Sequence, residues 1–397
     1  MRIYFLTSKL NFTTAGASVT ELDLLARTLQ GLGHTVTVVT AFSHRNDHSV
    51  AVPYSVIEEQ INAPRLIPLQ WSAYQLLKKH AATADFFHID GHLFLYGAGL
   101  YRVRGGRVPV AAFFNRELSS WPENKSSLFP HPPERLLRRL KQCLRHLVEK
   151  FLFMPLANRI DLCAFTNPFL QQAYADFGLR RPTRFIMGDP FDYQTSMHTY
   201  GITEDQYLKR NKTKGPIVLF YSSRMAPGKG FDLLLKAFAE VKNKEQFRLV
   251  LGGDGPEEPL IRAMIRDLSL EPYVSLPGWM SKEQLYNYLK QTDIFVQARW
   301  RTDMTSYSLL DAMAFGLPSI LPAGGGLQWD AQDSAVYFTD GDYKELARRI
   351  EELGANPKRR ADLSRNCYQR LKQDEMNYEL KAKELVAAME KIRMKLL

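Results

Sequence analysis

Short apolar runs alternate with helical segments along most of the chain, and this alternation limits the possible folds more than any other feature. In the first half, runs rich in β-branched and aromatic residues, which favour strands, lie at 3–8, 35–42, 86–91, 108–114 and 161–166. Between the first two, apolar residues recur at helical spacing, namely Leu22, Leu25, Ala26 and Leu29. A strand, a helix and a strand in this order form a βαβ unit, so we expect a parallel sheet.

The same alternation starts again in the second half, with strand-like runs at 216–223, 248–253, 274–278, 293–298 and 318–323. The predicted fold class is therefore α/β, with two doubly wound, Rossmann-like domains. We place the N-terminal domain at 1–195, a polar interdomain linker at 196–215 and the second domain at 216–375. The last segment, 376–397, has an apolar helical face that needs a partner, and we expect it to cross back to the N-terminal domain.

Composition excludes several classes of protein. With 45% hydrophobic and 24% charged residues over 397 positions, the chain should be globular rather than disordered. Its three cysteines follow neither a disulfide nor a zinc pattern. The first apolar run stops at Leu6, which is too short for a signal peptide, and no run is long enough to span a membrane. We therefore expect a cytoplasmic protein.

The chain carries 52 Lys and Arg against 42 Asp and Glu, a formal net charge of +10, which predicts an anionic partner. Four units of this excess lie in residues 134–152, where six basic and two acidic side chains accompany apolar residues at helical spacing. Such a basic amphipathic helix can lie on an anionic membrane surface, which predicts a peripheral membrane location. The alternative is that its apolar stripe packs on the domain. No nucleic-acid-binding motif is present, so nucleic acid is not an expected partner.

A candidate phosphate site follows the strand at 216–223. Arg224, Gly228, Lys229 and Gly230 lie in a short turn before a helical segment. Glycines allow a ligand to approach the backbone, a helix N-terminus offers free N–H groups, and the two cations add positive charge. The turn lacks the Walker pattern because Phe231 follows Lys229 and Gly230. It therefore predicts a diphosphate site or, on the simpler reading, only a turn.

Two further patterns follow in the second half. A glycine loop with Gly253 comes after the strand at 248–253, and it could equally be a tight turn before a helix. Asp303 and Asp311 lie eight positions apart, before a run of three glycines, Gly324, Gly325 and Gly326. Ionised carboxylates accept hydrogen bonds from sugar hydroxyls, although such acids are also common in solvated turns and at helix starts.

Taken in order, these blocks from Ile217 to Glu352 resemble the donor domain of the retaining glycosyltransferases of family 4, the glycosyl transferases group 1, which have the GT-B fold. The resemblance implies two Rossmann-like domains that face a central cleft. It implies that Arg224 and Lys229 grip the donor diphosphate, that Asp303 faces the donor sugar and that Asp311 binds the ribose hydroxyls. It also implies donor contacts from the glycine loops, at Gly253, Gly324, Gly325 and Gly326. Both acids are Asp where the family usually has Glu, and the usual glutamate after the glycine run is missing.

The resemblance continues, more weakly, in the first half. Gly16 lies where the family has a glycine-rich loop near the donor phosphate, and His88 lies at the first histidine of a strand-end motif. Asn115 replaces a terminal histidine near the reacting carbon, and Glu117 follows two positions later. By the resemblance, His88, Asn115 and Glu117 contact the acceptor. An amide cannot act as a general base, but it can hydrogen-bond a sugar hydroxyl.

The sequence therefore predicts a retaining glycosyltransferase that moves a sugar from a nucleotide diphosphate sugar to a hydroxyl of a glycan or lipid-linked glycan. No metal or other cofactor is expected. Two alternatives stay open: a GT-B epimerase or phosphorylase, and a catalytically silent protein that binds a nucleotide sugar or glycan. Product analysis with a labelled donor separates the enzymes, and donor hydrolysis argues against a silent protein.

Overall fold

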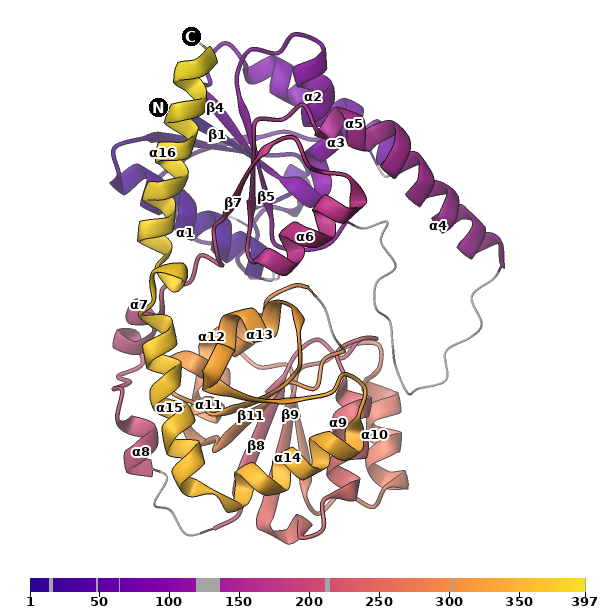
Figure 1. The fold of residues 1–397 in the computed structure, drawn as a ribbon, viewed down its shortest axis with the longest axis vertical. Coiled ribbons are helices and arrows are strands. Elements are labelled where there is room, and N and C mark those ends of the chain that lie inside the picture. Colours follow the sequence, from indigo (N-terminus) through magenta and orange to yellow (C-terminus); the bar gives the residue numbers. More distant parts are fainter. Residues whose placement is uncertain are drawn as a thin grey trace. The chain divides into compact units, whose positions relative to one another are not determined.

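The computed structural model describes residues 1–13, 17–47, 49–63, 65–118, 136–210, 215–300 and 303–396. Among these, the chain forms two compact units, each built on one sheet (Figure 1). The first unit contains residues up to 118, 136–191 and 374–396, and the second contains 192–373. The fold class predicted from the sequence, α/β with two Rossmann-like halves, is confirmed.

The first unit has a seven-stranded parallel sheet in the order β3-β2-β1-β4-β5-β6-β7. Its strands are β1 Arg2–Thr7, β2 Thr35–Thr40, β3 Ser55–Glu58, β4 Phe86–Asp90, β5 Val110–Phe114, β6 Leu162–Phe165 and β7 Thr183–Ile186. Its helices are α1 Ala17–Gly31, α2 Leu66–His80, α3 Gly91–Val103, α4 Leu136–Val148, α5 Met154–Ala157, α6 Pro168–Phe177 and α16 Tyr378–Leu396.

Helices cover both faces of this sheet. Helices α2, α3, α5 and α6 contribute to the core on one face, and α1 and α16 to the core on the other. The apolar stripe expected within 21–34 is buried, with Leu25 and Leu29 at most 2% exposed. Each leucine buried in this way stabilises the fold by roughly 1.5–3 kcal/mol.

The C-terminal helix α16 belongs to the first unit, although the chain reaches it after completing the second. Its residues Leu385 and Met389 are fully buried in the core that α1 forms with the sheet. Near its end, Arg393 pairs with Asp85 at 3.4 Å, and Figure 1 shows α16 beside α1.

The second unit has a six-stranded parallel sheet in the order β10-β9-β8-β11-β12-β13. Its strands are β8 Ile217–Ser222, β9 Phe247–Gly252, β10 Val274–Gly278, β11 Ile294–Val296, β12 Ser319–Pro322 and β13 Ala335–Phe338. Its helices are α7 Tyr193–Thr199, α8 Gln206–Arg210, α9 Phe231–Glu240, α10 Glu258–Asp267, α11 Lys282–Gln291, α12 Tyr307–Ala314, α13 Gly325–Ala331, α14 Tyr343–Ala355 and α15 Pro357–Leu371. The polar stretch expected to link the domains, 196–215, therefore contains α8 and the end of α7, both in this unit.

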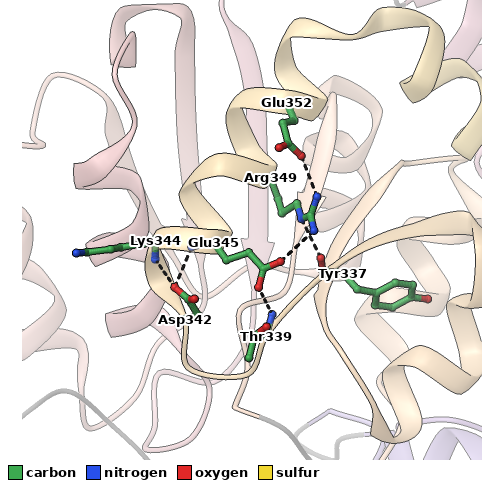
Figure 2. A network of polar contacts seen from close by, with 7 residues as sticks. All are labelled: Tyr337, Thr339, Asp342, Lys344, Glu345, Arg349 and Glu352. Carbon is green, nitrogen blue, oxygen red and sulfur yellow. Dashed lines mark hydrogen bonds and ion pairs between the residues drawn. The ribbon is translucent and has the colours of Figure 1, made fainter.

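A polar network fixes the start of α14 against the end of β13 (Figure 2). The Asp342 carboxylate accepts hydrogen bonds from the backbone N–H groups of Lys344 and Glu345, which caps the helix. Glu345 in turn accepts from the Thr339 backbone at 2.7 Å and from Arg349 at 3.0 Å. Helix α14 packs against α9, the helix that follows the predicted phosphate turn. The network therefore stabilises α14, which packs against α9 next to that turn.

Candidate functional site

In each unit, most of the described candidate residues lie in or next to loops at the carboxyl edge of a parallel sheet. All strand pairs of the second unit are parallel, so the loops after its strands emerge at the same edge. The strand order reverses between β8 and β11, and ligands of doubly wound sheets bind at such a reversal. The segments after these two strands hold the predicted phosphate turn and Asp303.

The turn after β8 presents its two cations near the start of α9. Arg224 is exposed and forms no ion pair with another described residue, while Lys229 is partly buried. The buried Tyr221 hydroxyl donates to the Lys229 carbonyl at 2.8 Å, which fixes the backbone of the turn. At Gly230 φ is +75°, and a Cβ there would collide with the Ala298 carbonyl. Only glycine therefore allows this turn to lie against the loop after β11.

The glycine loop after β9 pairs with the same turn through its backbone. The Ser223 N–H donates to the Gly252 carbonyl at 3.2 Å, and the Met225 N–H donates to the Asp254 carbonyl at 2.7 Å. Gly253 has φ of +110° and lies so close to the Ser223 carbonyl that a side chain would not fit. The structure thus brings the first two predicted loops together.

The two predicted acids lie on the connection from β11 to α12 and at the middle of that helix. Asp303 is partly buried, and its carbonyl lies 2.8 Å from the position that a Cβ on Gly326 would occupy. The third glycine of the run therefore packs directly on the Asp303 backbone. Asp311 accepts a hydrogen bond from the Tyr286 hydroxyl at 2.9 Å. Burial raises the pKa of Asp311 to about 6, and the Tyr286 hydrogen bond opposes this shift.

The glycine run opens helix α13. The Gly324 backbone N–H donates to the Gln328 side chain at 2.5 Å, so in this structure that donor is occupied by the chain itself. Gly325 and Gly326 form the first turn of the helix and are buried. The glycine run therefore lies beside Asp303, and the Gly324 N–H is already hydrogen-bonded to Gln328.

In the first unit, a second polar cluster occupies the carboxyl edge of the sheet. The strand order reverses between β1 and β4, and the Thr7 hydroxyl at the end of β1 donates to Asp90 at the end of β4 at 2.8 Å. Burial raises the pKa of Asp90 to about 6. The cluster thus begins at the reversal of this sheet, where a ligand site is expected.

Asn115, at the end of β5, joins the same cluster. Its amide donates to the Glu21 carboxyl at 2.5 Å and to the Ser18 hydroxyl at 3.3 Å, both on α1. Glu21 is only 4% exposed, and burial, followed by the nearby charge of Asp189, raises its pKa to about 8. The Asn115 amide nitrogen therefore points at α1, which leaves its carbonyl oxygen as the group that can face a substrate.

The other predicted residues of this unit lie in different surroundings. His88 lies inside the sheet, 4% exposed, between the rings of Phe5 and Phe113 at centroid distances of 4.4 and 6.0 Å. Burial lowers the pKa of His88 to about 3, so the ring is neutral, and its Nε2 forms no hydrogen bond with any described residue. Glu117 is partly buried just after β5. Gly16 lies outside the described residues.

Sequence reasoning missed Glu21 and Asp189, two carboxyl groups of this cluster. Glu21 precedes Leu22 and lies four positions before Leu25, so helical spacing alone places a carboxylate on the buried face of α1. That signal was available. Asp189 follows β7 in a loop and carries no such periodic signal. Among the described residues, no three His, Cys, Asp or Glu side chains form a group that could hold a metal ion.

The basic helix predicted at 134–152 comprises α4 and the turn after it. In the described part of this segment, apolar side chains stay in solvent, with exposed fractions of 56% for Leu140, 63% for Leu144, 51% for Leu147, 66% for Phe151 and 65% for Leu152. The alternative that these residues pack on the domain is therefore wrong for the described residues. None of the described helices is long and apolar enough to cross a membrane.

The comparisons with known proteins agree with this arrangement. The glycosyl transferases group 1 family matches residues 203–370. Mannosylfructose-phosphate synthase of Agrobacterium fabrum is 26% identical over 345 residues, covering 79% of this chain and 72% of that protein. The α-monoglucosyldiacylglycerol synthase of Acholeplasma laidlawii is 22% identical over 88% of this chain and 87% of its own length.

Solved structures share the fold over the whole chain. Sucrose-phosphate synthase from Thermosynechococcus elongatus superimposes with a TM-score of 0.75 at 19% identity and full coverage of both chains. HepE from Anabaena, solved in complex with UDP, has a TM-score of 0.69 at 17% identity, with 98% of this chain and 100% of that chain covered. The match to the glycosyl transferases group 1 over residues 203–370, the related sequences and the shared fold together support a nucleotide-sugar-dependent glycosyltransferase of the GT-B fold.

Proposed function

We propose that this enzyme transfers a sugar, with retention of the anomeric configuration, from a nucleotide diphosphate sugar to a hydroxyl of a glycan or lipid-linked glycan. The observation that carries the proposal is the contact at Gly230, where the cationic turn after β8 lies against the loop after β11. This contact joins Arg224 and Lys229 to the segment that bears Asp303. A diphosphate and its attached sugar need such a combination of cations and a carboxylate within one site.

In this proposal, Arg224 and Lys229 bind the donor diphosphate and stabilise the negative charge that develops as it leaves. The bond between the anomeric carbon and the diphosphate oxygen breaks, and the acceptor oxygen forms its bond on the same face. The acceptor proton passes to the leaving phosphate oxygen, so no protein base is required. Asp303 accepts from donor sugar hydroxyls and Asp311 from the ribose hydroxyls, with the glycine loops shaping the site. We propose no metal or other cofactor in this reaction.

The proposed acceptor site is the cluster at the carboxyl edge of the first sheet. Asn115 offers its carbonyl oxygen, and Glu117 lies two residues further along the same loop. The buried His88 supports the sheet next to Asp90 and reaches the acceptor only if the side chains around it move. Relatives named as glycolipid synthases make a lipid-linked acceptor the preferred class.

We also propose that the enzyme works as a peripheral protein on an anionic membrane surface. The exposed leucines of α4 provide an apolar stripe, and the exposed Lys141 and Lys150 provide positive charge beside it. A stripe of this kind is costly in water and favourable at a lipid interface. In this proposal, the enzyme and its lipid-linked acceptor both lie at the membrane surface.

A thermal-shift screen of UDP-, GDP- and ADP-sugars tests the donor assignment. A ligand that binds only the native state raises its stability, so one class of nucleotide sugar should raise the Tm and the others should not. Lys229→Ala should abolish the shift, while Lys242→Ala, an exposed lysine on another loop, should retain it. No shift with any nucleotide sugar would contradict the proposal.

The two alternative activities are separated by product analysis with a labelled donor. Label in a glycan or lipid product identifies a transferase, and label in an epimerised or phosphorylated free sugar identifies an epimerase or phosphorylase. A silent binding protein would shift its Tm with the donor without any hydrolysis or transfer.

A further inference from the structure

Two adjoining surface cavities lie at the amino edge of the first sheet, the edge opposite the proposed acceptor cluster. One, of about 730 Å³, is lined by Arg102, Val103, Gly105, Gly106, Arg107, Arg159 and Leu396. The other, of about 450 Å³, shares Gly105, Gly106 and Arg107 and adds side chains from the end of α2, including Tyr74 and Lys78. Each is large enough for a small ligand.

The described lining of both cavities contains five basic side chains and no acidic one. Arg102 pairs with Asp161 at 2.9 Å. The other four, Lys78, Arg104, Arg107 and Arg159, form no ion pair within the described part of the chain, although many arginines elsewhere do. Unpaired cations gathered around a cavity are the electrostatic signature of an anion site.

The loop between the cavities is held rigidly. Arg104 stacks on the rings of Trp71 and Tyr74, at 5.5 and 5.7 Å from their centroids. Arg102 donates to the Gly106 carbonyl at 2.5 Å, and a Cβ on Gly106 would collide with the Tyr101 ring. Because the stacking already positions Arg104, little of its side-chain entropy would be lost when an anion binds.

We infer that these cavities form a second anionic site, which binds a phosphate group through Arg104, Arg107, Arg159 and Lys78. Arginine and lysine are the side chains that bind phosphate best, and their number here suits a doubly charged group. The phosphate can come from a soluble diphosphate or from a phospholipid headgroup. Exposed apolar side chains lie beside the cavities, with Trp71 46% and Val103 51% exposed, and an interfacial tryptophan beside basic residues is typical of a membrane contact.

Two binding measurements test the site independently of transferase activity. Both use the full chain in an Arg224→Ala/Lys229→Ala background, so that the proposed donor site contributes nothing. The first is the Tm shift with sodium pyrophosphate, and the second is co-sedimentation with phosphatidylcholine vesicles with and without phosphatidylglycerol. The test variant is Arg104→Gln/Arg107→Gln. The matched control, Arg266→Gln/Arg348→Gln, removes the same charge from exposed positions of the second unit.

We expect the test variant to bind pyrophosphate, phosphatidylglycerol vesicles or both about five-fold more weakly for each arginine removed, while the control binds like the parent protein. A loss with pyrophosphate alone assigns the site to a soluble diphosphate, and a loss with vesicles alone assigns it to a lipid headgroup. Equal binding by test and control variants in both measurements would overturn the inference. Arg107→Gln alone keeps the test valid if loss of the Arg104 stacking destabilises the fold, because the Arg107 side chain is exposed and forms no ion pair with another described residue.

Discussion

Lys229 and Arg224 are the side chains on which the proposed chemistry depends most. Replacing either by alanine should lower kcat by on the order of 10²-fold or more, because each stabilises charge that develops only as the diphosphate leaves. Steady-state kinetics with the donor found in the thermal-shift screen will measure this. Lys242→Ala is the control for loss of one positive charge. Unchanged turnover in both Lys229→Ala and Arg224→Ala would contradict the assignment.

Glu21 gives a prediction about pH. Its pKa rises from about 4.5 to about 8 on folding, so between these values the folded state holds a proton that the unfolded state has lost. The carboxyl group therefore contributes less to stability as the pH rises through this window. Glutamine keeps an oxygen that can accept from Asn115 and cannot ionise. We expect the free energy of unfolding of Glu21→Gln, measured in urea, to increase steadily relative to that of the wild type from pH 5 to pH 8.

The matched substitution for this series is Glu258→Gln, at a position on α10 outside the buried cluster, with a carboxylate paired to Arg262 at 2.7 Å. The difference in free energy of unfolding between Glu258→Gln and the wild type should not change from pH 5 to pH 8 as it does for Glu21→Gln. A constant difference between Glu21→Gln and the wild type over the whole range would mean that Glu21 is already ionised in the folded protein.

Individual residues were predictable where the local pattern fixed the backbone. The turn at Arg224 to Gly230, the loop at Gly253 and the run at Gly324 to Gly326 all lie where the sequence indicated, because glycines and flanking strands define such turns locally. The Glu21 to Asn115 hydrogen bond joins residues 94 positions apart, and only the packing of α1 on the sheet brings them together. His88 was expected at the end of a strand, whereas it lies within β4, where the rings of Phe5 and Phe113 enclose it.

At the scale of elements, the contact between the turn after β8 and the loop after β11 should be sensitive to one methyl group. Gly230→Ala places a Cβ on the Ala298 carbonyl and strains a residue with φ of +75°. Gly33→Ala is the control, because Gly33 has φ of +85° but open space around its Cβ position. Strain alone costs roughly 1–3 kcal/mol, so urea unfolding should show a larger loss for Gly230→Ala. Equal losses would show that the contact is not tight.

The apolar stripe of α4 gives the prediction for the membrane. Leu144→Ser and Leu147→Ser should each weaken binding to anionic vesicles by roughly ten-fold, since a fully buried leucine contributes about 1.5 kcal/mol or more. The Tm should stay the same, because both side chains are more than half exposed. Leu260→Ser, a partly exposed leucine on α10, is the control. Unaltered vesicle binding in both α4 variants would show that the stripe does not contact lipid.

Secondary structure was predictable from the sequence where strands are central and apolar. All ten expected runs contain strands, since buried parallel strands form continuous apolar segments. Three strands at sheet edges were missed, namely β3, β7 and β13, because each has only four residues and none is buried throughout. Helices α7 and α8 were missed for a similar reason: they are short and polar, and α7 starts at a local signal, the Asp192 cap on the Thr195 N–H.

At the scale of the whole molecule, the excess of positive charge has a specific distribution. Part of it lies on α4, part in the turn at Arg224 and Lys229, and part around the cavities at Arg104 and Arg107. All three places are proposed to meet phosphate, as a lipid surface or as a diphosphate. Binding to anionic vesicles should therefore weaken as salt is raised, because exposed charges are screened within about 10 Å at 0.1 M ionic strength.

The activity proposed for this enzyme is glycosyl transfer with retention from a nucleotide sugar. Its most direct test is the NMR coupling constant of the anomeric proton in the purified product, formed from an α-configured nucleotide sugar of the class found in the thermal-shift screen. We expect an α-linked product, and its formation should be on the order of 10²-fold slower when Lys229→Ala replaces the wild-type enzyme. A β-linked product would contradict the retaining mechanism, and a product formed equally well by Lys229→Ala would contradict the proposed site.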